Sequence, residues 1–147
     1  MIEIVDLPEM TAIGILVEAH WNELPRAIPA AWTRLFETDT GAQNFLEVSI
    51  SRENGFYREL VGYLAAKKTE VPPGMTKLTI PAQRYLRLIH DGPLPEITLG
   101  FEKLYAHAAV AGLQSTDYKL DFGYLPGLPD GRHELHVALE PEPLKLA

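Results

Sequence analysis

Hydrophobic residues recur along this chain with two different periods, which separate expected helices from expected strands. A spacing of three and four residues predicts one amphipathic helix at Ile28, Ala31, Trp32, Leu35 and Phe36. The same spacing recurs at Ile97, Phe101, Leu104, Tyr105 and Ala108. Gly41 and Gly112 follow these segments, and Pro95 suits the first turn of the second. The sequence therefore predicts two amphipathic helices.

Runs rich in apolar and β-branched residues, bounded by turn residues, predict strands. The expected strands are Glu3 to Val5, Ala12 to His20, Phe45 to Ser51, Tyr57 to Ala66, Lys77 to Ile80, Tyr85 to His90, Tyr118 to Tyr124 and Glu134 to Leu139. Asn54-Gly55 and Asp130-Gly131 are typical of two-residue hairpin turns, because glycine accepts the positive φ that these turns demand. Hairpins combined with two helices indicate the α+β class.

An internal repeat becomes visible when the chain is compared with itself at a shift of 70 residues. The shift aligns Ala12 with Ala82, Leu16 with Leu86, His20 with His90, Leu24 with Leu94, and Pro25 with Pro95. We predict a single domain over 1–147, built from tandem βαββ repeats at 1–70 and 75–141 that are joined by Val71-Pro72-Pro73-Gly74. A pseudo-twofold axis would relate the repeats, with a curved antiparallel sheet, one long helix per repeat, and a crevice for a ligand between them.

Composition narrows the functional classes. The chain has 147 residues, of which 46% are hydrophobic and 22% charged, as in one compact domain. A net charge of −7 repels a phosphate backbone, so we predict no direct contact with nucleic acid and favour cationic or neutral partners. The apolar run from Ala12 to Val17 is too short for a membrane span and no basic residue precedes it, so we expect a cytoplasmic protein without membrane partners.

Motifs for metal, nucleotide or nucleophile chemistry are missing. The absence of cysteine excludes disulfides, thiolate zinc sites and a cysteine nucleophile. His133 and His136 are three residues apart, which in a strand directs their rings to opposite faces, whereas a zinc-binding H-E-x-x-H needs a spacing of four on a helix. His20 and His90 are interpreted as structural. We predict no metal site and no cofactor, and we assign no catalytic residue.

Several short motifs occur in an order that resembles one known family. They are Gly62-Tyr63-Leu64, Pro72-Pro73-Gly74-Met75, Ile80-Pro81-Ala82-Gln83-Arg84-Tyr85, His90-Asp91-Gly92 and Leu104-Tyr105. Over nearly the whole chain they resemble the GyrI-like small-molecule-binding domain, also called the AraC-type effector-binding domain. The resemblance implies tandem βαββ units around a hydrophobic pocket that takes up bulky aromatic or cationic compounds. A chain of this length is expected to be a stand-alone member, without a DNA-binding module.

The resemblance also implies a role for an acid. In relatives an acidic residue in a strand after the second helix meets the positive charge of the ligand, and the nearest position here is Asp121. Alternation along this strand places Asp121 on one face, and Phe122 and Tyr124 together on the other. The alternative is an exposed Asp121 paired with Lys119 or Arg132. Two further strand acids are expected to face solvent, Glu47 and Glu59.

Aromatic side chains beside an acid can hold a cation, because the face of an aromatic ring attracts positive charge. The candidate ligand-binding residues are Trp32, Tyr57, Glu59, Tyr85, Asp121, Phe122 and Tyr124. Packing in the core is the alternative for Trp32. We predict a stand-alone binding protein for hydrophobic, aromatic or cationic small molecules, in drug or toxin response. The alternatives are a hydrolase of strained, cyclopropane-bearing genotoxins and a gyrase-inhibitor-type factor with a protein partner.

Overall fold

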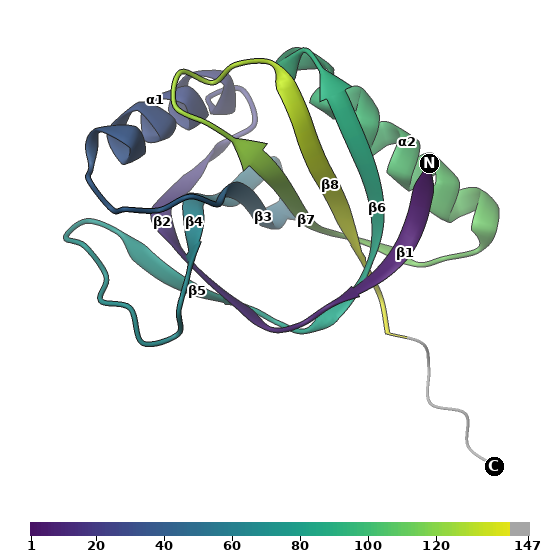
Figure 1. Ribbon diagram of the computed structural model, residues 1–147. Coiled ribbons are helices and arrows are strands. Elements are labelled where there is room, and N and C mark those ends of the chain that lie inside the picture. Colours follow the sequence, from purple (N-terminus) through teal and green to yellow (C-terminus); the bar gives the residue numbers. More distant parts are fainter. Residues whose placement is uncertain (142–147) are drawn as a thin grey trace.

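The computed structural model describes residues 1–141, which form one curved antiparallel sheet with two helices on one side (Figure 1). The first half holds β1 (Ile2–Leu7), β2 (Met10–His20), α1 (Leu24–Glu37), β3 (Phe45–Glu53) and β4 (Phe56–Ala65). The second holds β5 (Thr76–Ile80), β6 (Gln83–Gly92), a 3₁₀ turn η1 (Leu94–Glu96), α2 (Ile97–Ala111), β7 (Ser115–Tyr124) and β8 (Gly131–Leu139). The predicted α+β class is confirmed. The end of the predicted domain, 142–147, lies outside the described residues.

The strand order shows how the two halves interlock. The order is β1-β6-β8-β7-β3-β4-β2-β5, and it reads the same from the other end when each strand is exchanged for its equivalent in the other half. This is the arrangement that a pseudo-twofold axis predicts. The first strand of each half lies beside the other half, since β1 pairs with β6 and β5 pairs with β2. Each half therefore completes the sheet of the other.

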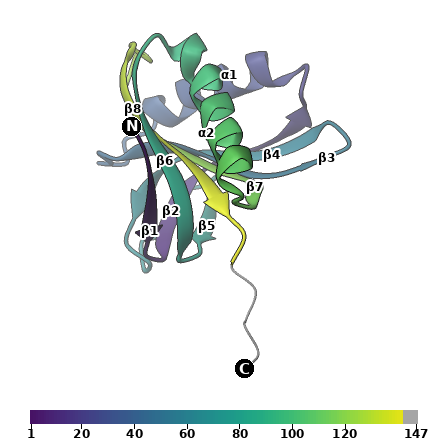
Figure 2. The ribbon, with the colours of Figure 1, turned by 90° about the vertical axis from the view of Figure 1, so that its right-hand side faces the viewer.

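The two helices cover different parts of the same face. Helix α1 packs on β2 and β4, and α2 packs mainly on β6 and β8, so the central strands β3 and β7 run between the two helices. Figure 2, seen from the side of α2, shows this helix in front with α1 behind it. One apolar core lies under each helix, around Trp32 and around Leu104. A third core fills the face away from the helices, around Leu46, Leu60 and Tyr85. We call these two sides the helix face and the opposite face.

The turns confirm one predicted hairpin and correct the other. Asn54 and Gly55 have φ of 52° and 75°, as a two-residue turn between β3 and β4 requires. The predicted turn at Asp130-Gly131 is wrong, because the loop between β7 and β8 covers 125–130 and Gly131 already belongs to β8. The Asp130 carboxylate instead accepts a hydrogen bond of 2.8 Å from the Leu94 main-chain nitrogen, so this loop is fixed to the start of η1.

Candidate functional site

An irregularity near the end of β7 decides which face its last side chain occupies. The pairing of β7 with β3 shifts between Phe122 and Tyr124, which leaves Gly123 as the extra residue of a β-bulge. Gly123 has a φ of +123°, and a Cβ added to it would lie 2.4 Å from a main-chain oxygen of β8. The bulge turns Tyr124 to the helix face, where Asp121 lies. The prediction that Tyr124 shares a face with Phe122 is therefore wrong.

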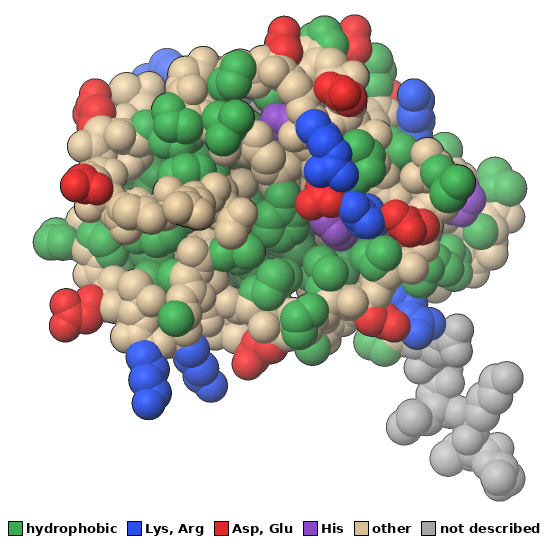
Figure 3. Space-filling view, in the orientation of Figure 1, with side chains coloured by type: hydrophobic (Ala, Val, Ile, Leu, Met, Phe, Trp, Pro, Cys, Tyr) green, Lys and Arg blue, Asp and Glu red, His purple; other side chains and the backbone are tan. Residues whose placement is uncertain are grey.

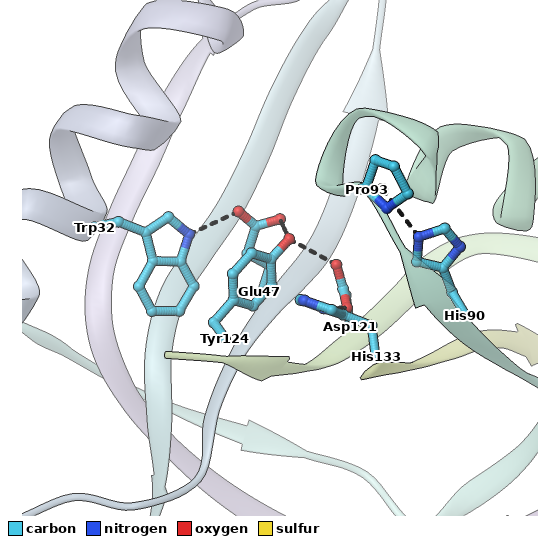
Figure 4. A network of polar contacts seen from close by, with 7 residues as sticks. All are labelled: Trp32, Glu47, His90, Pro93, Asp121, Tyr124 and His133. Carbon is cyan, nitrogen blue, oxygen red and sulfur yellow. Dashed lines mark hydrogen bonds and ion pairs between the residues drawn. The ribbon is translucent and has the colours of Figure 1, made fainter. Parts of the chain in front are cut away.

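Five side chains from α1, β3, β7 and β8 meet on the helix face, and we call them the acidic–aromatic network (Figure 4). The Trp32 indole donates a hydrogen bond of 2.8 Å to Glu47 Oε1. The Tyr124 hydroxyl lies 2.9 Å from Glu47 Oε2 and 2.6 Å from Asp121 Oδ2. His133 Nδ1 lies 2.7 Å from Asp121 Oδ1. The contacts form one continuous chain from the helix to β8.

Packing holds this network in place. The Tyr124 ring stacks on Trp32 with centroids 4.5 Å apart, and it meets the edge of the His133 ring at 4.7 Å. These three rings and Asp121 are buried, whereas Glu47 is half-buried. Glu47 is therefore the most exposed member of the network.

The number of hydrogens in the network determines its charge. A phenol has one hydrogen, and an ionised carboxylate only accepts, so the Tyr124 hydroxyl cannot donate to both acids at once. Both contacts are hydrogen bonds when Glu47 is neutral and donates to the Tyr124 oxygen, while Tyr124 donates to Asp121. Burial raises the pKa of Glu47 to about 8, assisted by the charge of Asp121 and opposed by the Trp32 hydrogen bond. Burial also raises the pKa of the Tyr124 hydroxyl, which keeps its proton.

A second pair of charged groups lies beside the network on the same face. The Glu59 carboxylate accepts a hydrogen bond of 3.2 Å from the Ser49 hydroxyl, and burial raises its pKa. The Lys119 ammonium lies 5.4 Å from the ring centre of Phe101 and 6.0 Å from that of Tyr105, both on α2. Burial lowers the pKa of Lys119, and the charge of Glu59 opposes this effect. The space between the helices thus already holds a cation over aromatic rings.

The three strand acids lie deeper than predicted. Glu47 and Glu59 are half-buried and do not simply face solvent, because their side chains point from the central part of the sheet toward the helices. Asp121 is only 3% exposed and bonds His133 and Tyr124, so the exposed alternative paired with Lys119 or Arg132 is wrong. Sequence reasoning did not place Glu47 and His133 in the site. Glu47 pairs directly with Asp121 in the register of β3 and β7, which the sequence does not show.

The other candidate residues lie elsewhere. Tyr57 is on the helix face near the β3–β4 turn, two residues from Glu59. Tyr85 belongs to the core of the opposite face, is fully buried, and its hydroxyl accepts a hydrogen bond of 2.7 Å from Gln83. Phe122 also points to the opposite face, where it lines a cavity of about 450 Å³. The structure brings together Trp32, Asp121 and Tyr124, and separates them from Tyr85 and Phe122.

The curved sheet, with one helix for each half, is the fold of a GyrI-like effector-binding domain. The chain belongs to the family described as integron-associated effector binding protein, whose Cass2 model matches residues 3–139. This membership supports small-molecule binding as the general role. Within residues 1–141, neither helix has the length and apolar character needed to cross a membrane.

The chain is also similar to individual proteins, in sequence or in fold. The chain is 26% identical over 128 residues to the transcriptional regulator BrlR of Pseudomonas aeruginosa, covering 82% of this chain and 46% of BrlR, so it spans about half of that relative. Its fold is similar to SAV2435 bound to tetraphenylphosphonium, with a TM-score of 0.72, 11% identity and coverage of 95% and 94% of the two chains. It is also similar to a Vibrio cholerae integron cassette protein, with a TM-score of 0.70, 9% identity and coverage of 95% of each chain.

Proposed function

We propose that this protein binds hydrophobic aromatic compounds, cationic ones above all, between α1 and α2, with Glu47 as the acid that meets the ligand. The observation that carries the proposal is the pair of carboxylates, Glu47 and Asp121, enclosed by the stacked rings of Trp32 and Tyr124. Asp121 is bonded by Tyr124 and His133, whereas Glu47 has no ion-pair partner among the described residues, so its ionised form is costly in this buried place unless a cation compensates it. A cation flanked by aromatic rings supplies that compensation.

Access and long-range charge support the same ligand class. Glu47 and Glu59 are both half-buried on the strip of sheet between the helices, so a ligand bound against this strip would contact acids. Phe101 and Tyr105 on α2 provide apolar rings at its side. The net charge of −7 attracts cations from a distance. Similarity to a protein determined with tetraphenylphosphonium supports the choice of an aromatic cation as the first probe.

A titration with tetraphenylphosphonium, followed by calorimetry and by thermal unfolding, tests the proposal. At one hundred times its dissociation constant, a bound ligand adds about 2.7 kcal/mol to the free energy of unfolding. Glu47→Gln keeps a partner for the Trp32 indole but removes the charge, so it should weaken binding by about tenfold or more. Glu18→Gln is the matched control, since Glu18 is an exposed acid on β2 that pairs with Arg58. The absence of binding across a panel of aromatic cations and neutral aromatics would contradict the proposal.

Hydrolysis is the second candidate function, because one geometric condition for it is met. Asp121 lies within hydrogen-bond distance of the Tyr124 hydroxyl and of His133. A carboxylate that orients an imidazole is an arrangement for general-base activation of water, and a phenol can stabilise charge on a leaving oxygen. Incubation with a cyclopropane-bearing genotoxin should then give turnover that Asp121→Asn abolishes without loss of folding. Recovery of the unaltered compound would leave binding alone.

A further inference from the structure

A cavity lies mainly on the opposite face of the sheet, where both halves of the chain line it, and at the end of β7 it also reaches Tyr124. Its volume of about 450 Å³ is in the range of small-molecule sites. One wall is apolar and consists of Val5, Leu7, Met10, Leu64 and Phe122. The polar lining includes Gln43 and Asn44 together with a group that we call the polar wall, namely Arg87, Arg132, Glu134 and His136. Figure 3 shows hydrophobic side chains gathered in the middle of the view, with basic and acidic side chains beside them.

The polar wall offers no unpaired acid. Glu134 accepts a hydrogen bond from Arg87 through Oε1, and Arg87 also bonds Glu3 at 2.9 Å. Arg132 approaches the same Oε1 atom at 3.7 Å, and its side chain is 61% exposed. A guanidinium has five N–H donors, so this one long ion pair leaves most of the hydrogen-bonding capacity of Arg132 for another partner. A cation meets no unpaired acid at this wall, whereas an anion can accept hydrogen bonds from Arg132.

His136 adds one buried ring nitrogen, Nδ1, that has no hydrogen-bond partner in the described part of the chain. The side chain is 3% exposed. Its ring meets the rings of Phe122 and Tyr85 edge-on, at 5.5 and 5.6 Å. Burial lowers the pKa of His136 to about 4, so at pH 7 the neutral ring can donate or accept one hydrogen bond. Buried polar atoms are rarely left unpaired, and a polar group of a bound molecule would supply the missing partner.

We propose that this cavity is a second binding site, for amphipathic carboxylates whose apolar body packs on Phe122 and Leu64 and whose carboxylate meets Arg132 and His136. The site shares Tyr124 with the acidic–aromatic network, but the groups that meet the carboxylate, Arg132 and His136, are different residues and select the opposite charge. It therefore stands independently of the proposed binding of cations.

Calorimetric titration with 2-naphthoate, an apolar ring that carries a carboxylate, tests this site. Two ligands with the same naphthalene ring and a neutral or cationic group in place of the carboxylate serve as controls. The neutral 2-acetylnaphthalene and the cationic 2-naphthylmethylammonium should bind at least about tenfold more weakly, since a hydrogen bond to a charged group is worth about that factor. Arg132→Met keeps much of the apolar stem and should weaken naphthoate binding by a similar factor. Arg26→Met changes an exposed arginine of α1 and should have no effect. The imidazole ¹⁵N signals of His136 should shift when naphthoate is added.

Several results would overturn the proposal. These are equal affinity for the three naphthalene ligands, undetectable binding of naphthoate, or unchanged affinity in Arg132→Met. Competition supplies a further criterion: saturating tetraphenylphosphonium, and separately Glu47→Gln, should leave the naphthoate dissociation constant unchanged. Mutual exclusion of the two ligands would show one site instead of two. Failure of tetraphenylphosphonium to bind would count against the proposed function but not against the carboxylate site, which the naphthoate titration tests separately.

Discussion

At the scale of single residues, Glu47 is an acid whose charge depends strongly on its surroundings. Trp32 from α1, Asp121 and Tyr124 from β7, and Glu59 from β4 all act on it. The hydrogen bond from Trp32 favours the ionised form of Glu47, and burial outweighs it. In the free protein Glu47 is therefore neutral and donates a hydrogen bond to the Tyr124 oxygen. A bound cation would favour the ionisation of Glu47.

The raised pKa of Glu47 predicts the pH dependence of stability. The folded state holds this proton up to about pH 8, whereas the unfolded chain releases it near pH 4.5. The contribution of Glu47 to the free energy of unfolding is therefore complete below pH 4.5 and is lost as the pH rises toward 8. Urea unfolding of the wild type and of Glu47→Gln across this range measures it. The wild type should lose stability relative to the variant as the pH rises, and parallel curves would contradict the assignment.

The same proton predicts how ligand affinity depends on pH. If a cation binds ionised Glu47, binding releases up to one proton below about pH 8, and affinity increases as the pH rises. Calorimetry of tetraphenylphosphonium binding in two buffers with different ionisation enthalpies counts the protons released. Glu47→Gln should release fewer protons than the wild type. Binding without proton release would show that the cation does not ionise Glu47.

At the scale of the elements, the bulge in β7 positions the network. Gly123 combines a positive φ with a close approach to β8, so both conditions require glycine. Gly123→Ala should lower the free energy of unfolding by more than about 2 kcal/mol and displace the Tyr124 ring from Trp32. Gly41→Ala is the matched control, because Gly41 has a φ of +67° but nothing within 4 Å of an added Cβ. Chemical denaturation and the near-ultraviolet circular dichroism of the aromatic rings measure both effects, and equal losses in the two variants would contradict the role of the close approach.

The contact between β7 and α2 yields another prediction. The Lys119 ammonium lies over the rings of Phe101 and Tyr105. The proposed ligand would contact the same two rings. Lys119→Met removes this competing charge and should raise the affinity for tetraphenylphosphonium by about tenfold, within the range of a cation–π contact. Lys103→Met, at an exposed position of α2, is the control and should change little. Weaker binding in Lys119→Met would show that Lys119 supports the site instead of competing for it.

At the scale of the whole molecule, the exchanged edge strands make the two halves interdependent. Because β1 pairs with β6 and β5 pairs with β2, each half taken alone loses the partner of an edge strand. Fragments 1–70 and 75–141 should therefore each lack a cooperative unfolding transition and regain it when mixed. Circular dichroism during urea unfolding measures this. A fragment that unfolds cooperatively by itself would contradict the interdependence.

Local patterns in the sequence were enough to predict the helices, most strands and the turn at Asn54-Gly55, because these depend on neighbouring residues. The repeat and the ordered motifs predicted the tandem architecture and the family, since they report on the whole chain. The acids were harder to place. Alternation assumes a regular strand, and the bulge at Gly123 breaks that regularity, so Tyr124 was assigned to the wrong face.

The tertiary structure alone decided the chemistry of the site. Glu47 and His133 join Asp121 only because β3, β7 and β8 lie side by side, and their separations in the sequence give no sign of a 2.7 Å or 2.9 Å contact. The pKa of Glu47 follows from burial under a helix that contributes Trp32, which is a property of the packed protein. The cavity at His136 likewise arises from residues of both halves that are far apart in the sequence. The sequence by itself determined the family, the repeat and the residue types available, whereas burial and register determined which acids are neutral and which side chains share a face.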